Sequence, residues 1–361
     1  MAPSKQSDAL ATLKTTILNL KTLLHRFHTA LQSPTPVHPP IEDSPNPLAL
    51  LSDASQILKA QTTKLSLLIL NKPFTASAIV FILNSLSNSC LPAMMSALEL
   101  CPAEKYTNLL HQYIQTSLSR MMMELQSLLA LIPQDEHGIE KTGSRDILAS
   151  TGVLWAECDK VVALGSGGLT RLAAERIEEF HGLLKDAIAE LEEWDPDEES
   201  ESDTDSLTSN KGTTSSAWPV DASLEKSLQG LTLSPVAALR KRTLVILRII
   251  RLLYPALIKR RILTFSNINN STTSESLPTS SHIQSLDALL DHTKQFTEET
   301  DEIAGALYAG DEEEVEDRLG NLAEISKICV EEVRIGWGGN EDEFTAWAEK
   351  WKARLEEVRR G

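Results

Sequence analysis

Apolar residues recur at steps of three and four along most of the chain, a spacing that places them on one face of an α-helix. The longest such run ends at Asp195-Pro196, because proline cannot continue a helix. Its members are Leu169, Ala173, Ile177, Phe180, Leu184, Ile188, Leu191 and Trp194. An apolar face of this length must be buried against other helices.

The same spacing predicts further helices, separated by short polar or proline-containing segments. They cover about residues 7–32, 47–71, 75–98, 102–132, 151–160, 235–263, 283–309, 311–333 and 341–358. Pro92 is expected to kink or split its helix, and Pro255 to kink another near its end. No segment alternates convincingly like a β-strand, and short loops favour antiparallel neighbours. The sequence therefore predicts an all-α protein made of antiparallel helical bundles.

Residues with helix-capping chemistry stand at several of the predicted ends. Asn46 and Ser234 are expected as N-caps, each followed by a proline at the first helical position. Gly310 is expected to stop one helix, so that Asp311 starts the next. Residues 340–343 resemble a capping box at the start of the last helix.

Periodicity is lost after Trp194, where Ser, Thr, Asp, Glu and Gly dominate. Such a composition buries too little apolar surface to offset the entropy of ordering the segment. We therefore expect three parts. They are an N-terminal bundle of about five to six helices over 1–194, an acidic serine-rich flexible linker over 195–222 and a C-terminal helical bundle over 223–361.

The formal net charge of −17 over 361 residues argues against a general affinity for nucleic-acid phosphates, which bind clustered Lys and Arg. The four cysteines lack a C-x-x-C spacing, so neither a zinc site nor a disulfide framework is predicted. The most apolar segment, 244–258, contains Arg248 and Arg251 and is shorter than the ~20 residues of a spanning helix. Since the N-terminus also lacks an apolar signal core, we expect no transmembrane segment.

No set of residues predicts catalysis, a cofactor or a metal site. His25 and His28 share a helix face, but no third ligand follows at a useful spacing. The segment Gly165–Gly168 precedes a helix N-terminus but lacks the strand and Lys-Ser/Thr of a phosphate loop, which favours a plain connector over an anion site. The run Met121–Met123 favours gap-filling in a core over an adaptable binding groove. Because G-x-S-x-G and H-E-x-x-H are also absent, we expect a protein that is not an enzyme.

Residues 240–261 contain eight basic side chains and no acid. At 100° per residue, five of the eight share roughly one quadrant of the helix. These five are Arg240, Lys241, Arg248, Arg251 and Lys259. We interpret this basic face as the candidate partner-binding site. The overall negative charge favours a protein or intramolecular partner over nucleic acid or an anionic membrane surface.

An acidic tract from Glu192 to Asp205 contains nine carboxylates and no base. Ser200 and Ser202 each precede an acid by three residues, which makes them candidate phosphorylation sites that would add ~1.5 to 2 charges each. The alternative is a solvated linker without regulation. A sharper hypothesis is that the tract folds back on the basic face and competes with an external acidic partner.

The motifs Trp-x-x-Cys-Asp, Lys-Asp-Ala and Trp-Asp-Pro occur together around the longest helix. The residues that carry them are Gly152, Trp155, Cys158, Asp159, Lys185, Asp186, Trp194 and Pro196. In these motifs the chain resembles the cyclin-D-binding protein family, also called GCIP or the human homologue of MAID, in a divergent form of fungal type. Lys72-Pro73, the acidic spacer and the basic helix from Ser234 also follow the family's order.

The resemblance implies an all-helical protein that works by binding, with bundles similar to those of vinculin and α-catenin. It implies negative regulation of cell-cycle progression or transcription through D-type cyclin or helix-loop-helix partners, in the cytoplasm and the nucleus. We therefore expect a helical adaptor that holds a partner helix between bundle helices, with the motif residues building the fold. The alternative is a cytoskeletal or membrane-surface bundle module.

Overall fold

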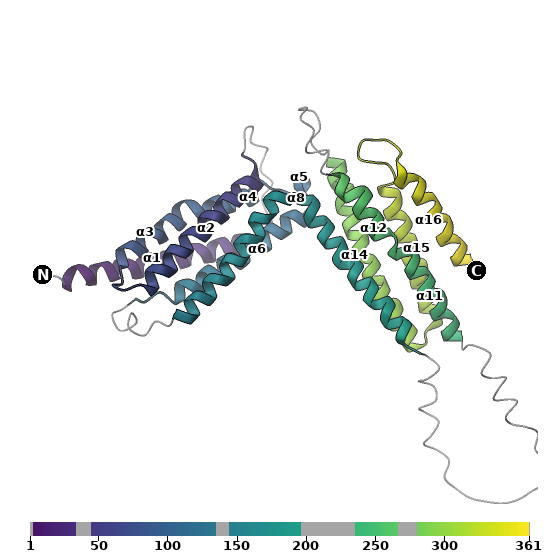
Figure 1. Cartoon of the computed structure of the whole chain (residues 1–361), viewed down its shortest axis with the longest axis horizontal. Helices are drawn as coiled ribbons and strands as arrows, with labels where there is room; N and C mark the ends of the chain where they lie inside the picture. The colour runs from purple at the N-terminus through teal and green to yellow at the C-terminus, as the bar shows by residue number, and fades with distance from the viewer. Residues whose placement is uncertain (1–2, 34–44, 135–143, 196–234, 266–279, 361) are drawn as a thin grey trace, which may run out of the picture. The chain divides into compact units, whose positions relative to one another are not determined.

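The computed structural model describes residues 3–33, 45–134, 144–195, 235–265 and 280–360 (Figure 1). Within these ranges every regular element is a helix and no strand occurs, so the all-α prediction is confirmed. The chain divides into two compact units, residues 1–172 and residues 173–361. Nearly all of the predicted acidic linker, 195–222, lies outside the described residues.

The first unit is a helical bundle, and two pairs of its long helices run antiparallel. Its elements are α1 (Pro3–Leu31), α2 (Pro47–Leu70), α3 (Ala76–Ser85), the π-helical turn η1 (Leu86–Cys90), α4 (Leu91–Glu99), α5 (Ala103–Tyr106), α6 (Asn108–Ala130) and the first part of α8 (Ser144–Glu193). Ser119 and His28 are 3.1 Å apart, and Gln115 donates to the Leu31 carbonyl, so α6 runs antiparallel to α1.

Helices α2 and α8 are likewise antiparallel. The hydroxyls of Ser66 and Thr151 lie 2.5 Å apart inside the bundle, while Lys59 and Asp159 pair nearer its surface. The interior between the helices is almost purely aliphatic, as the low aromatic content predicts. Met121 and Met122 are buried in it, which confirms the predicted core role for two of the three methionines, whereas Met123 is exposed.

One helical run of the first unit, Ala76–Glu99, has the length and the mean hydropathy, 1.5, that would allow it to cross a membrane. Side chains of this run, among them Ile79, Leu83 and Met94, are buried in the aliphatic core of the bundle. Where a kink or a split is predicted at Pro92, the run stays helical and contains the π-helical turn η1, which ends two residues before this proline. The predicted helix over 102–132 is also divided, because Thr107 has a φ of 81°.

Several predicted helix ends are confirmed by their hydrogen bonds. The Asn46 side chain accepts from the backbone N–H of Leu48 and of Ala49, directly before Pro47. Asp311 accepts from the Glu314 N–H and opens its helix directly after Gly310. The last helix begins at a different cap from the predicted one, because Asp342 rather than Asn340 accepts the first N–H groups.

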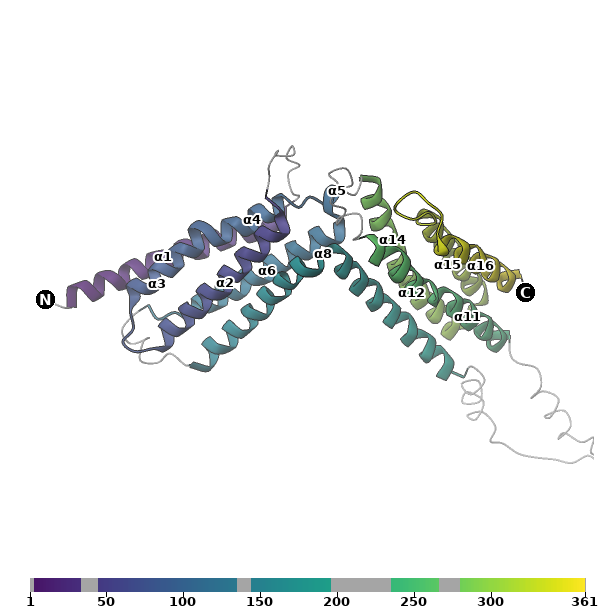
Figure 2. The same cartoon turned by 45° about the horizontal axis from the view of Figure 1, so that its top comes forward.

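The second unit contains the second part of α8 and all of the later helices (Figures 1 and 2). The later elements are α11 (Pro235–Arg251), α12 (Leu253–Leu257), the π-helical turn η2 (Ile258–Ile262), α14 (Ser280–Ala309), α15 (Glu312–Glu332) and α16 (Glu343–Arg360). Trp351 donates to the Ile249 carbonyl over 2.9 Å, and Arg242 donates to the Arg359 carbonyl over 2.9 Å. Helices α11 and α16 therefore run antiparallel along one seam.

The division between the units falls at residue 172, before the predicted boundary at 194. Helix α8 is interrupted at Gly168, whose φ of 58° and ψ of −158° are not helical. After this break, Ile177, Leu184 and Leu191 are fully buried, and Tyr254 of α12 stacks on His181 at 5.4 Å. The difference arises because the apolar face of the second part of α8 is buried by the later helices. Only Gly168 departs from helical geometry in the predicted connector.

Candidate partner-binding surface

The predicted basic face lies on the run α11–α12–η2 of the second unit, and two of its five residues hold the end of α8. Arg240 donates from Nε to the Leu191 carbonyl and from a terminal nitrogen to the Glu192 carbonyl, each over 2.6 Å. The last carbonyls of a helix have no partner within it, so this guanidinium caps α8. Arg248 pairs with the Glu192 carboxylate at 2.8 Å.

The other three predicted residues differ in their surroundings. Arg251 is half-buried, and its charge contributes to a lowered pKa of His181, for which burial of the imidazole is the main cause. Lys241 and Lys259 are exposed, and neither forms an ion pair with any residue that the structure describes. The predicted face therefore divides into two arginines that hold the end of α8, a half-buried Arg251, and two lysines that are exposed.

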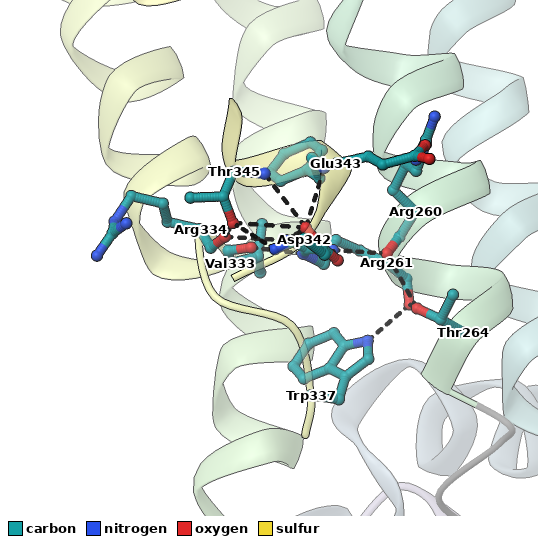
Figure 3. A network of polar contacts seen from close by, with 10 residues as sticks. Arg260, Arg261, Thr264, Val333, Arg334, Trp337, Asp342, Glu343 and Thr345 are labelled. Carbon is teal, nitrogen blue, oxygen red and sulfur yellow. Dashed lines mark hydrogen bonds and ion pairs between the residues drawn. The ribbon is translucent and has the colours of Figure 1, made fainter. Parts of the chain in front are cut away.

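Arg261, one of the eight bases of residues 240–261 but not one of the five of the predicted face, is fully buried. Its guanidinium donates to the carbonyls of Val333, Arg334 and Arg260 and forms two hydrogen bonds, of 2.7 and 3.1 Å, with Asp342 (Figure 3). The Arg261 guanidinium carbon also lies 4.2 Å from the centroid of the Phe344 ring. A buried charge requires such complete pairing, since desolvation is otherwise very costly.

The loop between α15 and α16 is fixed through the same residue. Trp337 donates from Nε1 to the Arg261 carbonyl over 2.7 Å (Figure 3). Its ring also meets Phe265 edge-on at 5.0 Å. Hydrogen bonding from Arg261 holds the pKa of the Asp342 carboxyl below its usual value. These contacts fix where α16 begins and therefore where Phe344 lies.

Two hollows open along the seam between the α11–α12–η2 run and α16. The first, of about 650 Å³, is lined by Pro235, Ala238, Leu239, Lys241, Arg242, Val245, Glu312, Glu316 and Val358. Here Arg242 pairs with Glu316. Two basic residues, Lys241 and Arg242, and two acidic residues, Glu312 and Glu316, line this hollow, so its lining has no net charge.

The second hollow, of about 300 Å³, is lined by Leu252, Pro255, Ala256, Lys259, Arg260, Phe344 and Trp347. Its charged lining residues are both basic, although Arg260 pairs with Glu343. Leu252 is 52% exposed despite being apolar. The result is an apolar hollow with a positive rim, a chemistry that suits a partner with both apolar and acidic side chains.

The motif residues of the first unit have mainly packing roles. Asp159 pairs with Lys59 of α2 at 2.5 Å, and the same Lys59 ammonium lies 5.9 Å from the centroid of the Trp155 ring. Cys158 is fully buried, and burial raises the pKa of its thiol to about 12. These contacts join α2 to α8. Gly152 is exposed, and the structure gives it no contact that explains its place in the motif.

In the second unit, Trp194 meets Tyr308 edge-on at 4.8 Å, the packing contact expected of it. Lys185 is exposed and lies 3.9 Å from Glu178, and Asp186 is exposed. Pro196 and the two predicted phosphorylation sites, Ser200 and Ser202, lie outside the described residues.

His28, one of the two histidines that share a helix face, is engaged by neighbouring side chains. His28 contacts Gln32 and Ser119 through its two ring nitrogens, at 3.0 and 3.1 Å. Among the described residues, no group of three or more His, Cys, Asp or Glu side chains is placed to hold a metal ion. Sequence reasoning did not identify Arg261 or the Leu252–Trp347 hollow. The aromatic run at the start of the last helix was the available signal for the hollow.

Comparison with known proteins finds similarity over the segment that carries the motif residues. An uncharacterized protein of Schizosaccharomyces pombe is 26% identical over 322 residues, which cover 88% of this chain and 86% of the relative. The family model described as Grap2 and cyclin-D-interacting, N-terminal, matches residues 50–197, from α2 to just beyond the end of α8. The resemblance stated from the motifs is thereby confirmed as a match of residues 50–197 to the Grap2 and cyclin-D-interacting N-terminal domain.

Proposed function

We propose that this protein is a non-catalytic helical adaptor that restrains cell-cycle progression or transcription by binding a cyclin or a helix-loop-helix protein. The observation that carries the proposal is the match of residues 50–197 to a domain family described as cyclin-D-interacting. A site for protein binding needs an exposed surface with apolar and charged groups, and the second unit presents one along α11 and α16. The protein acts in the cytoplasm and the nucleus.

The role of the family motif in this proposal is architectural. Trp155, Cys158 and Asp159 make their main contacts within the first unit, and Trp194 makes its contact within the second. They determine how the helices pack, and the partner is recognised by other residues.

The proposal is tested by affinity purification of the tagged full chain from its native cells, at low and at high salt, with quantitative mass spectrometry. We expect a cyclin or a helix-loop-helix protein to be enriched over a tag-only control, and to be reduced at high salt because exposed charges are screened. Loss of the gene should advance entry into the division cycle. Enrichment of neither class, together with an unchanged cycle, contradicts the proposal.

The alternative, a membrane-surface or cytoskeletal module, is tested with the same purified protein. Cosedimentation with anionic vesicles or with actin filaments, lost in a variant with Arg240, Arg248 and Arg251 reversed in charge, favours the alternative. Because Arg240 and Arg248 also hold the end of α8, the fold of this variant must be verified by circular dichroism.

A further inference from the structure

The exposed residues of the α11–α12–η2 run form one straight stripe. At 100° per residue, Lys241, Val245, Arg248, Leu252 and Lys259 fall within a narrow sector of the helix. Val245 and Leu252 are 36% and 52% exposed, and each lines one of the two hollows beside α16. The two apolar side chains are seven residues apart, about 10 Å along the axis.

The aromatic side chains of α16 that line the second hollow are held in place by contacts within the unit. The ring of Phe344 is 5.6 Å from that of Trp347, which in turn stacks on Trp351 at 6.4 Å. Trp351 donates to the Ile249 carbonyl, and Arg261 lies against the Phe344 ring. Aromatic side chains that are already held in place lose little entropy on binding, which is typical of sites that dominate an interface.

Positive charge stands at both ends of the stripe. Lys241 and Lys259 are exposed, have no ion-pair partner in the described part of the chain, and are 18 positions apart, about 27 Å in a helix. This length corresponds to about five turns of a partner helix, with apolar anchors at i and i+7 between acidic ends.

We propose that this stripe, together with the two hollows beside α16, is the docking groove for an acidic amphipathic helix of the partner protein. One bulky apolar side chain of that helix enters the Leu252–Trp347 hollow, and another packs on Val245 seven positions away. Carboxylates in its first and last turns meet Lys241 and Lys259. The inference rests on the proposed function and names the surface and the partner chemistry that this function would use.

The acidic residues along the groove disfavour an anionic membrane as the occupant. Glu312 and Glu316 line the first hollow, and Glu343 stands beside Arg260 at the second. A flat anionic surface would be repelled by these carboxylates while it is attracted by the lysines. A helix can instead place its few acidic side chains opposite the lysines alone. The concave hollows also suit side chains of a helix better than a lipid surface.

The test uses the full chain and a fluorescent synthetic helical peptide of about 20 residues, with Leu at two positions seven apart and Glu in both end turns. A control peptide of the same composition has its leucines on opposite faces. Binding is followed by fluorescence anisotropy. We expect the designed peptide to bind at least about tenfold more tightly than the control peptide.

Variants then locate the site. Leu252→Asp and Lys259→Glu should each weaken binding about tenfold or more. Their matched controls, Leu183→Asp and Lys350→Glu, change exposed residues of the same unit that line neither hollow and should change binding less than about twofold. A peptide with Lys in place of Glu at one end should regain affinity for Lys259→Glu, a rescue that a folding defect cannot produce.

Equal binding of the two peptides, or equal effects of Leu252→Asp and Leu183→Asp, overturns the proposal. If the peptide binds only after the nine acids of 192–205 are neutralised, the groove is assigned to this chain's own acidic tract, and the proposal is overturned. Vesicle binding that depends on Lys259, without peptide binding, does the same. If a cyclin copurifies yet these variants bind it normally, the groove proposal fails while the proposed function stands.

Discussion

The guanidinium of Arg261 and the carboxylate of Asp342 are joined by two hydrogen bonds, one of 2.7 Å and one of 3.1 Å. The same carboxylate accepts the backbone N–H groups of Phe344 and Thr345, so one side chain both caps α16 and neutralises a buried arginine. Because Phe344 lines the second hollow, this pair links the stability of the unit to the shape of its candidate binding surface.

Arg261→Met should lower the free energy of unfolding of the second unit by about 3 kcal/mol. The substitution leaves the buried Val333 carbonyl without its donor, and a loss of this kind costs about 1 to 3 kcal/mol. It also removes the hydrogen bonds to Asp342 and one of the two donors to the Arg334 carbonyl, which keeps the Thr345 hydroxyl. Arg260→Met removes a neighbouring but partly exposed ion pair and should cost less than about 1 kcal/mol. Urea unfolding followed by tryptophan fluorescence measures both, and equal losses would contradict a special role for Arg261.

The Asp342 contact should also make stability depend on acid pH. Hydrogen bonding from Arg261 lowers the carboxyl pKa in the folded state, so the unfolded state binds a proton more readily. The stabilisation is therefore fully present above the unfolded pKa, about 3.8, and is lost as pH falls through the lower folded pKa. The stability difference between the native protein and Asp342→Asn should shrink over this window. A difference that stays constant down to the lowest pH at which the protein folds would refute the assignment.

The four cysteines should be unreactive in the folded protein. All four thiols are buried, and burial raises the pKa of Cys90, Cys101 and Cys158 to about 12 and that of Cys329 as well. A thiol–disulfide reagent attacks the thiolate, so we expect no modification of the native chain at pH 8 and four modified thiols in denaturant. Rapid native modification of even one cysteine would show that the packing of its helix is wrong.

Two glycines of the second unit should respond oppositely to alanine. Gly310 has a φ of 69° between α14 and α15, where a β-carbon is strained, so Gly310→Ala should cost about 1 kcal/mol. Gly305 lies on the exposed face of α14, and no atom lies within 4 Å of the place that a Cβ would occupy, so Gly305→Ala should stabilise by up to about 1 kcal/mol. Thermal melts of the two variants give the comparison, and shifts of the same sign would count against the assigned helix ends.

The helical periodicity predicted most elements because a helix buries one face wherever it packs. It predicted the cap at Asn46 and the stop at Gly310, since both depend on local chemistry. The apolar spacing of residues 311–333 predicts a buried Ile328, yet this side chain is 54% exposed, because the adjacent Cys329 and Val330 occupy the buried positions. Steps of three and four allow either assignment, and only the neighbouring helices decide between them.

The candidate surface was predicted only in part. The sequence counts Arg261 among the eight bases but assigns it no place, and the structure buries it within η2, a π-helical turn that alters the register there. Arg240 was assigned to the partner face, although its guanidinium caps α8. Both outcomes depend on residues distant in sequence, Asp342 and Leu191, which periodicity does not pair.

The central claim is that this chain acts by binding a protein. Its most direct test mixes the purified full chain with a purified D-type cyclin and measures the mass of the eluted species by size-exclusion chromatography with light scattering. We expect a complex whose mass is the sum of one chain and one cyclin, weakened by added salt. Elution of two unchanged, separate species at concentrations of about 50 μM, well above a micromolar dissociation constant, would contradict a cyclin as the partner.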